Sequence, residues 1–157
     1  MITNIIIRPA RTDDVKTLQD LNDEIFINNH TYDPDLRMDW AQSEDGGKKY
    51  FTELLQNDDV ICLIAEVDGK SVGYLAASTK EFSYRMSKCI ELENMGVRPT
   101  YRSSGIGSKL ISRLYELAKE RGFKRVYVNA YFQNTQGVEF YKRQGFSEID
   151  ISLEKVL

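Results

Sequence analysis

Histidine and cysteine are scarce in this chain of 157 residues, which has one histidine, His30, and two cysteines, Cys62 and Cys89. The cysteines stand far apart inside apolar stretches, so their spacing is not that of metal ligands. Neither has a histidine close to it in sequence, which argues against a cysteine nucleophile that carries an acyl group. We therefore expect no metal site, two buried and reduced thiols, and a cytoplasmic protein.

Excess positive charge and long apolar runs are also lacking. The formal net charge is -3, whereas domains that bind nucleic acid by neutralising its phosphates are usually basic. No apolar run approaches the length that spans a membrane, and the first residues lack the basic-then-apolar order of a signal peptide. We expect neither nucleic acid nor a membrane as a partner.

Repeats, low-complexity tracts and linkers are absent from the sequence, and its length suits a single domain over residues 1–157. Asp68-Gly69 between two apolar runs predicts a hairpin turn. Residues 28–45 show no periodicity and are expected to form a long loop. The expected strands are 4–8, 60–67, 71–79, one from 89 that ends before Pro99, 125–132 and 146–153, and helices are expected from 12, over 48–56, from 106 and over 134–143.

A glycine-containing turn, Arg102-Ser103-Ser104-Gly105-Ile106-Gly107, follows the strand that begins at Cys89. Glycines allow a tight turn with outward N–H groups, and a helix N-terminus reached this way binds anions, most naturally phosphate. A plain strand-to-helix turn explains the same residues. The third glycine of a dinucleotide fingerprint is missing, and Ser108 and Lys109 stand in the wrong order for a Walker A loop.

These residues resemble the GNAT superfamily of N-acetyltransferases. Its signature Arg/Gln-x-x-Gly-x-Gly/Ala is matched by Arg102, Gly105 and Gly107 without a gap. The segment from Asn134 to Phe146 is similar to a second motif, Asn-x-x-Ala-x-x-x-Tyr-x-x-x-Gly-Phe, with Gly137 where alanine is usual. The resemblance covers the chain from about Ile61 onward and is weak before it.

The resemblance implies the family's α/β fold, α+β by some schemes, in which a mixed sheet has helices on both faces. Its fourth and fifth strands splay apart, and the acyl donor acetyl-CoA lies between them. Residues 60–157 would form the acetyl-CoA-binding core and residues 1–59 the acceptor side. The residues expected to bind acetyl-CoA are Met95, Val97, Arg102, Ser103, Ser104, Gly105, Ile106, Gly107, Ser108, Asn134 and Tyr141.

Two carboxylates, Glu91 and Glu93, are two residues apart and therefore lie on the same face of one strand. Burying carboxylates there costs desolvation free energy unless that face opens to solvent or substrate. An amine attacks a thioester only in its neutral form, so a base is useful. Many family members carry a glutamate four residues before the position of Val97, and we expect Glu93 to be the base. Glu91 as the base, and no protein base at all, remain alternatives. A purely structural role, in an ion pair with Lys88 or Arg98, is a further alternative.

Tyr141 matches the family tyrosine beside the sulfur of CoA, and we expect it to protonate the departing thiolate. Aromatic packing is the alternative for Tyr141, and helix capping alone is the alternative for Asn134. In the 28–45 loop, His30, Tyr32 and Trp40 are expected to wall the acceptor site together with Glu91, and Asp33, Asp35 and Asp39 to favour a cation there. A plain loop residue is the alternative for His30, and a solvated loop explains the acids equally well.

The sequence therefore predicts an acetyl-CoA-dependent N-acetyltransferase that moves the acetyl group directly to a primary amine of a small molecule. An amino group of a peptide or protein is one alternative acceptor. A CoA-binding sensor or interaction module without turnover is the alternative from another class. The expected strand from Phe146 would leave a sheet edge at which two copies could pair as a homodimer.

Overall fold

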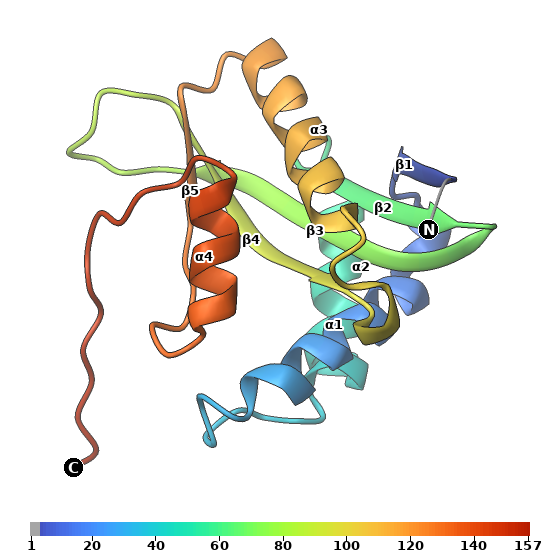
Figure 1. The fold of residues 1–157 in the computed structure, drawn as a ribbon, viewed down its shortest axis with the longest axis horizontal. Helices are drawn as coiled ribbons and strands as arrows, with labels where there is room; N and C mark the ends of the chain where they lie inside the picture. Colours follow the sequence, from blue (N-terminus) through green and yellow to red (C-terminus); the bar gives the residue numbers. More distant parts are fainter. Residues whose placement is uncertain (1–3) are drawn as a thin grey trace.

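The computed structural model describes residues 4–157, and residues 1–3 lie outside it. Five strands form one mixed sheet in the order β1-β2-β3-β4-β5 (Figure 1). The strands are β1 (Ile5–Pro9), β2 (Ile61–Val67), β3 (Lys70–Lys80), β4 (Cys89–Val97) and β5 (Arg125–Val128). The strands β1 to β4 pair antiparallel, and β5 pairs parallel with β4. The predicted hairpin is confirmed, with Asp68 and Gly69 both at positive φ between β2 and β3.

Helices cover both faces of the sheet, which confirms the α/β prediction. On one face, α1 (Val15–Asn29) and α2 (Lys49–Leu55) pack around Leu18, Phe51 and Tyr74. On the other face lies α3 (Ile106–Glu120), and α4 (Thr135–Arg143) stands beside β5 (Figure 1). Short turns are η1 (Thr12–Asp14), η2 (Trp40–Gln42), η3 (Glu44–Lys48) and η4 (Pro99–Tyr101). Within residues 4–157, no helix is long and apolar enough to cross a membrane.

The apolar periodicity of α3 explains how it packs. Its buried residues recur every three to four positions and form one stripe against the sheet. They are Ile106, Leu110, Ile111, Leu114 and Ala118. The helix ends before Gly122, whose φ of 81° is the left-handed conformation that glycine adopts without strain. This packing fixes the N-terminus of α3 next to the end of β4.

The strand β4 is longer than its pairing with β5. Only Cys89–Leu92 pairs with β5, and β4 then continues to Val97. The strand predicted over 125–132 ends at Val128, because the chain leaves β4 and the hydroxyl of Tyr131 instead donates to Asp33 Oδ2 at 2.7 Å. Among the described residues, the second half of β4 has no strand partner on the β5 side. The predicted splay of the fourth and fifth strands is therefore present.

The strand predicted over 146–153 is wrong. Phe146 packs against Tyr115 and Tyr141, but the chain from Ser147 to Leu157 is exposed, pairs with no strand and runs away from the sheet (Figure 1). The alternating apolar residues that suggested a strand specify one only where an edge pairs with them. Without this strand, the sheet edge on which the homodimer expectation rested is also missing.

Candidate active site

A β-bulge in β4 brings Glu93 and Asn94 to the same face of the sheet. On β3, the consecutive residues Ala76 and Ala77 pair with Asn94 and Leu92, so Glu93 is an extra residue in β4. The flanking Leu92 belongs to the core on the α3 face, whereas Glu93 and Asn94 both contact Tyr50 of α2. A bulge of this kind re-aims side chains that regular alternation would place on opposite faces.

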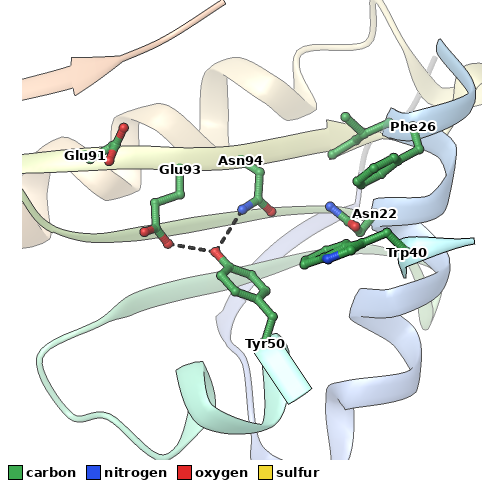
Figure 2. A pocket seen from close by; sticks show the side chains of 8 residues that line it. Asn22, Phe26, Trp40, Tyr50, Glu91, Glu93 and Asn94 are labelled. Atoms are coloured by element: carbon green, nitrogen blue, oxygen red, sulfur yellow. Dashed lines mark hydrogen bonds between the residues drawn. The ribbon is translucent and has the colours of Figure 1, made fainter. Parts of the chain in front are cut away.

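A pocket of about 410 Å³ lies on this face, between α1, η2, α2 and β4 (Figure 2). Aromatic rings form one side of it. Phe26 stacks on Trp40 with ring centroids 5.6 Å apart, and Trp40 lies 5.7 Å from the ring of Tyr50. The pocket combines these apolar faces with two carboxylates and two amides. Its lining residues are Asn22, Ile25, Phe26, Trp40, Tyr50, Glu91, Glu93 and Asn94.

A chain of hydrogen bonds runs from the core to Glu93. Asn22 donates to the hydroxyl of Tyr74 at 2.9 Å, and that hydroxyl donates to Asn94 Oδ1. Asn94 Nδ2 then donates to the hydroxyl of Tyr50 at 3.0 Å. The hydroxyl of Tyr50 donates to Glu93 Oε2 at 2.7 Å (Figure 2). Burial and the neighbouring Glu93 carboxylate raise the pKa of Tyr50 far above its ordinary value, so Tyr50 remains a donor.

The ion pairs considered for Glu93 do not form in the described part of the chain. Arg98 instead pairs with Glu24 at 2.7 Å, and the Lys88 ammonium donates to the carbonyl of Arg121. The other carboxylate, Glu91, lies 3.8 Å from the ammonium of Lys80. Glu93 therefore faces the pocket as a carboxylate held by a neutral hydroxyl.

The loop from Ser103 to Ser108 has the backbone geometry of an anion site. Ser103 and Gly105 adopt positive φ values of 63° and 85°, and the α-helical hydrogen bonds of α3 begin only with the amide of Lys109. Among residues 4–157, the amides from Ser103 to Ser108 find no acceptor. The positive end of the helix dipole and these free N–H groups together favour a phosphate.

Arg102 connects the loop to the end of β4. Its Nε donates to the carbonyl of Val97 at 3.0 Å, so the side chain ties the loop to the end of β4. The Val97 carbonyl thus accepts a hydrogen bond from Arg102, and the expectation that backbone groups of Met95 and Val97 bind the cofactor stays a prediction. Gly107 lets α3 approach α4 closely, because an added Cβ would lie 2.9 Å from Phe140 Cζ and 3.7 Å from Met95 Cε.

The expected helix at the second motif is confirmed, and Asn134 caps it by accepting from the amide of Gly137 at 3.1 Å. An added Cβ at Gly137 would lie 2.6 Å from Asn134 Nδ2, so this glycine makes room for the cap. Tyr141 packs against Phe140 and Phe146. Burial raises the pKa of Tyr141 to about 12, and its hydroxyl has no hydrogen-bond partner among the described residues.

Two residues expected at the acceptor site lie outside the pocket. His30 is exposed at the C-terminal end of α1, and Tyr32 stacks on Tyr131 at 6.1 Å. Conversely, the sequence analysis missed Asn22, Phe26, Tyr50 and Asn94. Asn22 and Phe26 follow Leu18 at four-residue spacing, and a polar residue in such a buried stripe is the signal that could have found Asn22.

The thiols have the environment expected of inert groups. Burial, with a smaller contribution from Asp14, raises the pKa of Cys62 to about 12, and burial also raises the pKa of Cys89. A thiol that stays protonated is a poor nucleophile. In residues 4–157, no group of three or more His, Cys, Asp or Glu side chains is placed to hold a metal ion.

Known proteins share both sequence and fold with this chain. An uncharacterized N-acetyltransferase of Methanocaldococcus jannaschii is 35% identical over 65% of this chain, but the match spans only 46% of that protein. One from Archaeoglobus fulgidus is 36% identical over 62% of this chain and 67% of its own length. The structure of the aminoglycoside N-acetyltransferase AAC(6')-Iy in complex with CoA has a TM-score of 0.79 at 19% identity, over 98% of this chain and 95% of that one.

The model of the Acetyltransferase (GNAT) family matches residues 17–146. The matched region contains the pocket residues from Asn22 to Asn94, the loop at the start of α3 and all of α4. The chain therefore belongs to the Acetyltransferase (GNAT) family.

Proposed function

We propose that this protein is an acetyl-CoA-dependent N-acetyltransferase that moves the acetyl group directly to a primary amine of a small molecule. The observation that carries the proposal is the position of Glu93. The bulge in β4 turns this carboxylate into a pocket, on the strand whose end reaches the anion-binding loop. An acceptor base and a donor site therefore meet on one strand.

The residues of the donor side fit acetyl-CoA. The free amides from Ser103 to Ser108 suit its pyrophosphate, and the unpaired half of β4 around Met95 offers backbone groups to the amides of its pantetheine arm. When bound, acetyl-CoA supplies a thioester whose C–S bond breaks as the new C–N bond forms. Residues 60–157 form this donor side, and residues 1–59 supply the opposite wall of the pocket through α1, η2 and α2.

Two side chains of this protein transfer the protons of the reaction. The carboxylate of Glu93 accepts a proton from the amine nitrogen, directly or through a water, because only a neutral amine attacks. The phenol of Tyr141 donates its proton to the sulfur that leaves. A pKa of about 12 keeps Tyr141 protonated at neutral pH, and its hydroxyl makes no competing hydrogen bond within residues 4–157.

The size and the aromatic lining of the acceptor side are compatible with a small amine. The pocket holds about 410 Å³ and is walled on one side by three aromatic rings. AAC(6')-Iy, whose structure this fold resembles, is named as an enzyme of aminoglycosides, which are small amines.

A thiol-release assay tests the proposal. Purified protein with acetyl-CoA is offered small amines, aminoglycosides, amino acids and short peptides, and free CoA is measured. We expect release with small amines and much slower release with peptides. Faster release with peptides would make the peptide alternative correct. Tight CoA binding without release with any amine would support a sensor in place of an enzyme.

A further inference from the structure

One end of the acceptor pocket contains a buried hydrogen-bond acceptor that no described group satisfies. Asn22 is 4% exposed, and its Oδ1 has no partner within residues 4–157, although its Nδ2 donates to Tyr74. Buried amide oxygens are nearly always paired, because leaving one unpaired is destabilising. Asn22 lines the pocket, and a turn of its amide, whose Oδ1 is covered in this structure, would bring that oxygen to a ligand N–H group.

Two aromatic residues line the same pocket as Asn22. Phe26 stands one helical turn after Asn22 on α1 and stacks on Trp40. In the view of Figure 2, Asn22 appears on the same side of Asn94 as Phe26 and Trp40, and Glu93 appears on the other side. Ring faces attract organic cations, and an ammonium is also a strong donor to a carbonyl oxygen. This end of the pocket is therefore suited to an ammonium.

The charge of the pocket has one sign. Of the eight residues that line it, two are glutamates and none is lysine or arginine. Lys80 lies 3.8 Å from Glu91 and offsets part of its charge, but no ion pair of Glu93 occurs among the described residues. A ligand carboxylate would meet Glu93 without a compensating cation, whereas a second ammonium would be attracted.

We infer that the acceptor is a short diamine without a carboxylate, an inference that rests on the proposed function. Its reacting nitrogen lies beside Glu93 and forms the C–N bond. Its second nitrogen remains an ammonium, donates to Asn22 Oδ1 and lies against Phe26 and Trp40. The proton balance of the reaction is unchanged, because the second ammonium keeps its protons throughout.

Matched substrates test this inference with the wild-type protein. Cadaverine, pentylamine and lysine share a chain of five carbons. Pentylamine lacks the second amine of cadaverine, and lysine adds a carboxylate to it. A fourth compound, 2-deoxystreptamine, tests whether an aminocyclitol diamine reacts as well as an aliphatic one. We expect kcat/KM for cadaverine to exceed that for pentylamine by at least about tenfold, or about 1.4 kcal/mol. Lysine should be worse than lysine methyl ester, which lacks the negative charge. Equal kcat/KM for cadaverine and pentylamine, or for lysine and its ester, would overturn the inference.

Variants then locate the second ammonium. Asn22→Ala and Trp40→Leu should bring the cadaverine-to-pentylamine ratio of kcat/KM close to one, mainly through the KM for cadaverine. Tyr84→Leu is the matched control, because it removes an aromatic residue that pairs with Phe82 outside the pocket and should leave the ratio unchanged. An unchanged ratio in both pocket variants, if they keep the circular dichroism spectrum of the wild type, contradicts the assignment.

Calorimetry separates this inference from the proposed function. Cadaverine and pentylamine are titrated into the protein saturated with CoA. Tighter binding of cadaverine without thiol release in the assay would overturn the proposed function and support the diamine site. Thiol release with equal binding of both amines would support the proposed function and overturn the diamine site.

Discussion

The hydroxyl of Tyr50 donates a hydrogen bond to Glu93 across 2.7 Å, and this is the last bond of a chain that begins at Asn22. The two residues are far apart in sequence, and α2 and β4 bring them together. This hydrogen bond restrains the carboxylate side chain of Glu93 to one orientation in the pocket. Tyr50 is thus a positioning residue for the proposed base.

Glu93→Gln should lower kcat/KM at neutral pH by about 100-fold and flatten the rise of the rate with pH. Tyr50→Phe should lower kcat about tenfold, because the carboxylate of Glu93 loses the hydrogen bond that holds it in position in the pocket. The measurement is a pH profile of thiol release. Glu91→Gln is the control in the same pocket, and a profile flattened by Glu91→Gln but not by Glu93→Gln would assign the base to Glu91.

Tyr141→Phe should lower turnover by about 100-fold, because the variant lacks the phenolic proton for the leaving sulfur. Affinity for CoA should stay the same, and stability should not fall, because the hydroxyl has no partner to lose among the described residues. Tyr115→Phe is the matched control. It removes a hydrogen bond to the carbonyl of Gln144 at 2.8 Å, so it should cost about 1 kcal/mol of stability without changing turnover. Wild-type turnover in Tyr141→Phe would remove Tyr141 from the mechanism.

Gly107→Ala should raise the KM for acetyl-CoA about tenfold. Its methyl group would lie 2.9 Å from Phe140 Cζ, which is closer than van der Waals contact, so the ring of Phe140, or α4 with it, must shift at the donor site. Gly122→Ala is the control at the other end of α3. Its φ of 81° makes alanine strained by about 1–2 kcal/mol, but it should lower only the melting temperature. An unchanged KM in Gly107→Ala would show that the donor site tolerates this movement.

Asp14 connects β1 to the start of α1 and should make stability depend on pH. It accepts two hydrogen bonds from Arg8, at 2.8 and 2.9 Å, and one from the amide of Arg11. The hydrogen bond from the Arg8 guanidinium is the main cause that lowers the pKa of Asp14 below its ordinary value of 3.8. The stabilisation is therefore complete above about pH 4 and is lost as pH falls through the lowered pKa.

Asp14→Asn should reduce the free energy of unfolding at pH 7 by about 2 kcal/mol. The loss should shrink in acid, where the wild type also loses the charge. Chemical denaturation at several pH values measures both effects. Asp13→Asn, which changes an exposed neighbour, should have almost no effect. Equal losses for Asp14→Asn at pH 7 and pH 2 would contradict this role of the ion pair.

The parts of the fold that local sequence determines were predictable. The hairpin at Asp68-Gly69, the buried stripe of α3 and the cap at Asn134 each depend on a few neighbouring residues. Strand ends depend on partners, which is why β5 is shorter than predicted and the strand from Phe146 does not form. Sequence spacing alone cannot locate a bulge, so it could not show that Glu93 and Asn94 share a face.

The candidate site likewise has a part that local sequence determines and a part that only the fold assembles. The loop from Ser103 to Ser108 could be proposed as a phosphate site from the sequence because its residues are contiguous. The pocket is assembled from α1, η2, α2 and β4, so Tyr50 and Asn22 had no local motif to reveal them. Arg102 was correctly placed in the loop, but its hydrogen bond to Val97 depends on the fold of the strand end.

Calorimetric titration with CoA and, separately, with pantetheine tests the central claim most directly. Pantetheine lacks the pyrophosphate that the amides from Ser103 to Ser108 should bind. We expect CoA to bind at least about 100-fold more tightly, a difference of about 2.7 kcal/mol. Equal affinity for the two compounds, or no binding of CoA, would contradict the assignment of this loop and with it the proposed acetyltransferase.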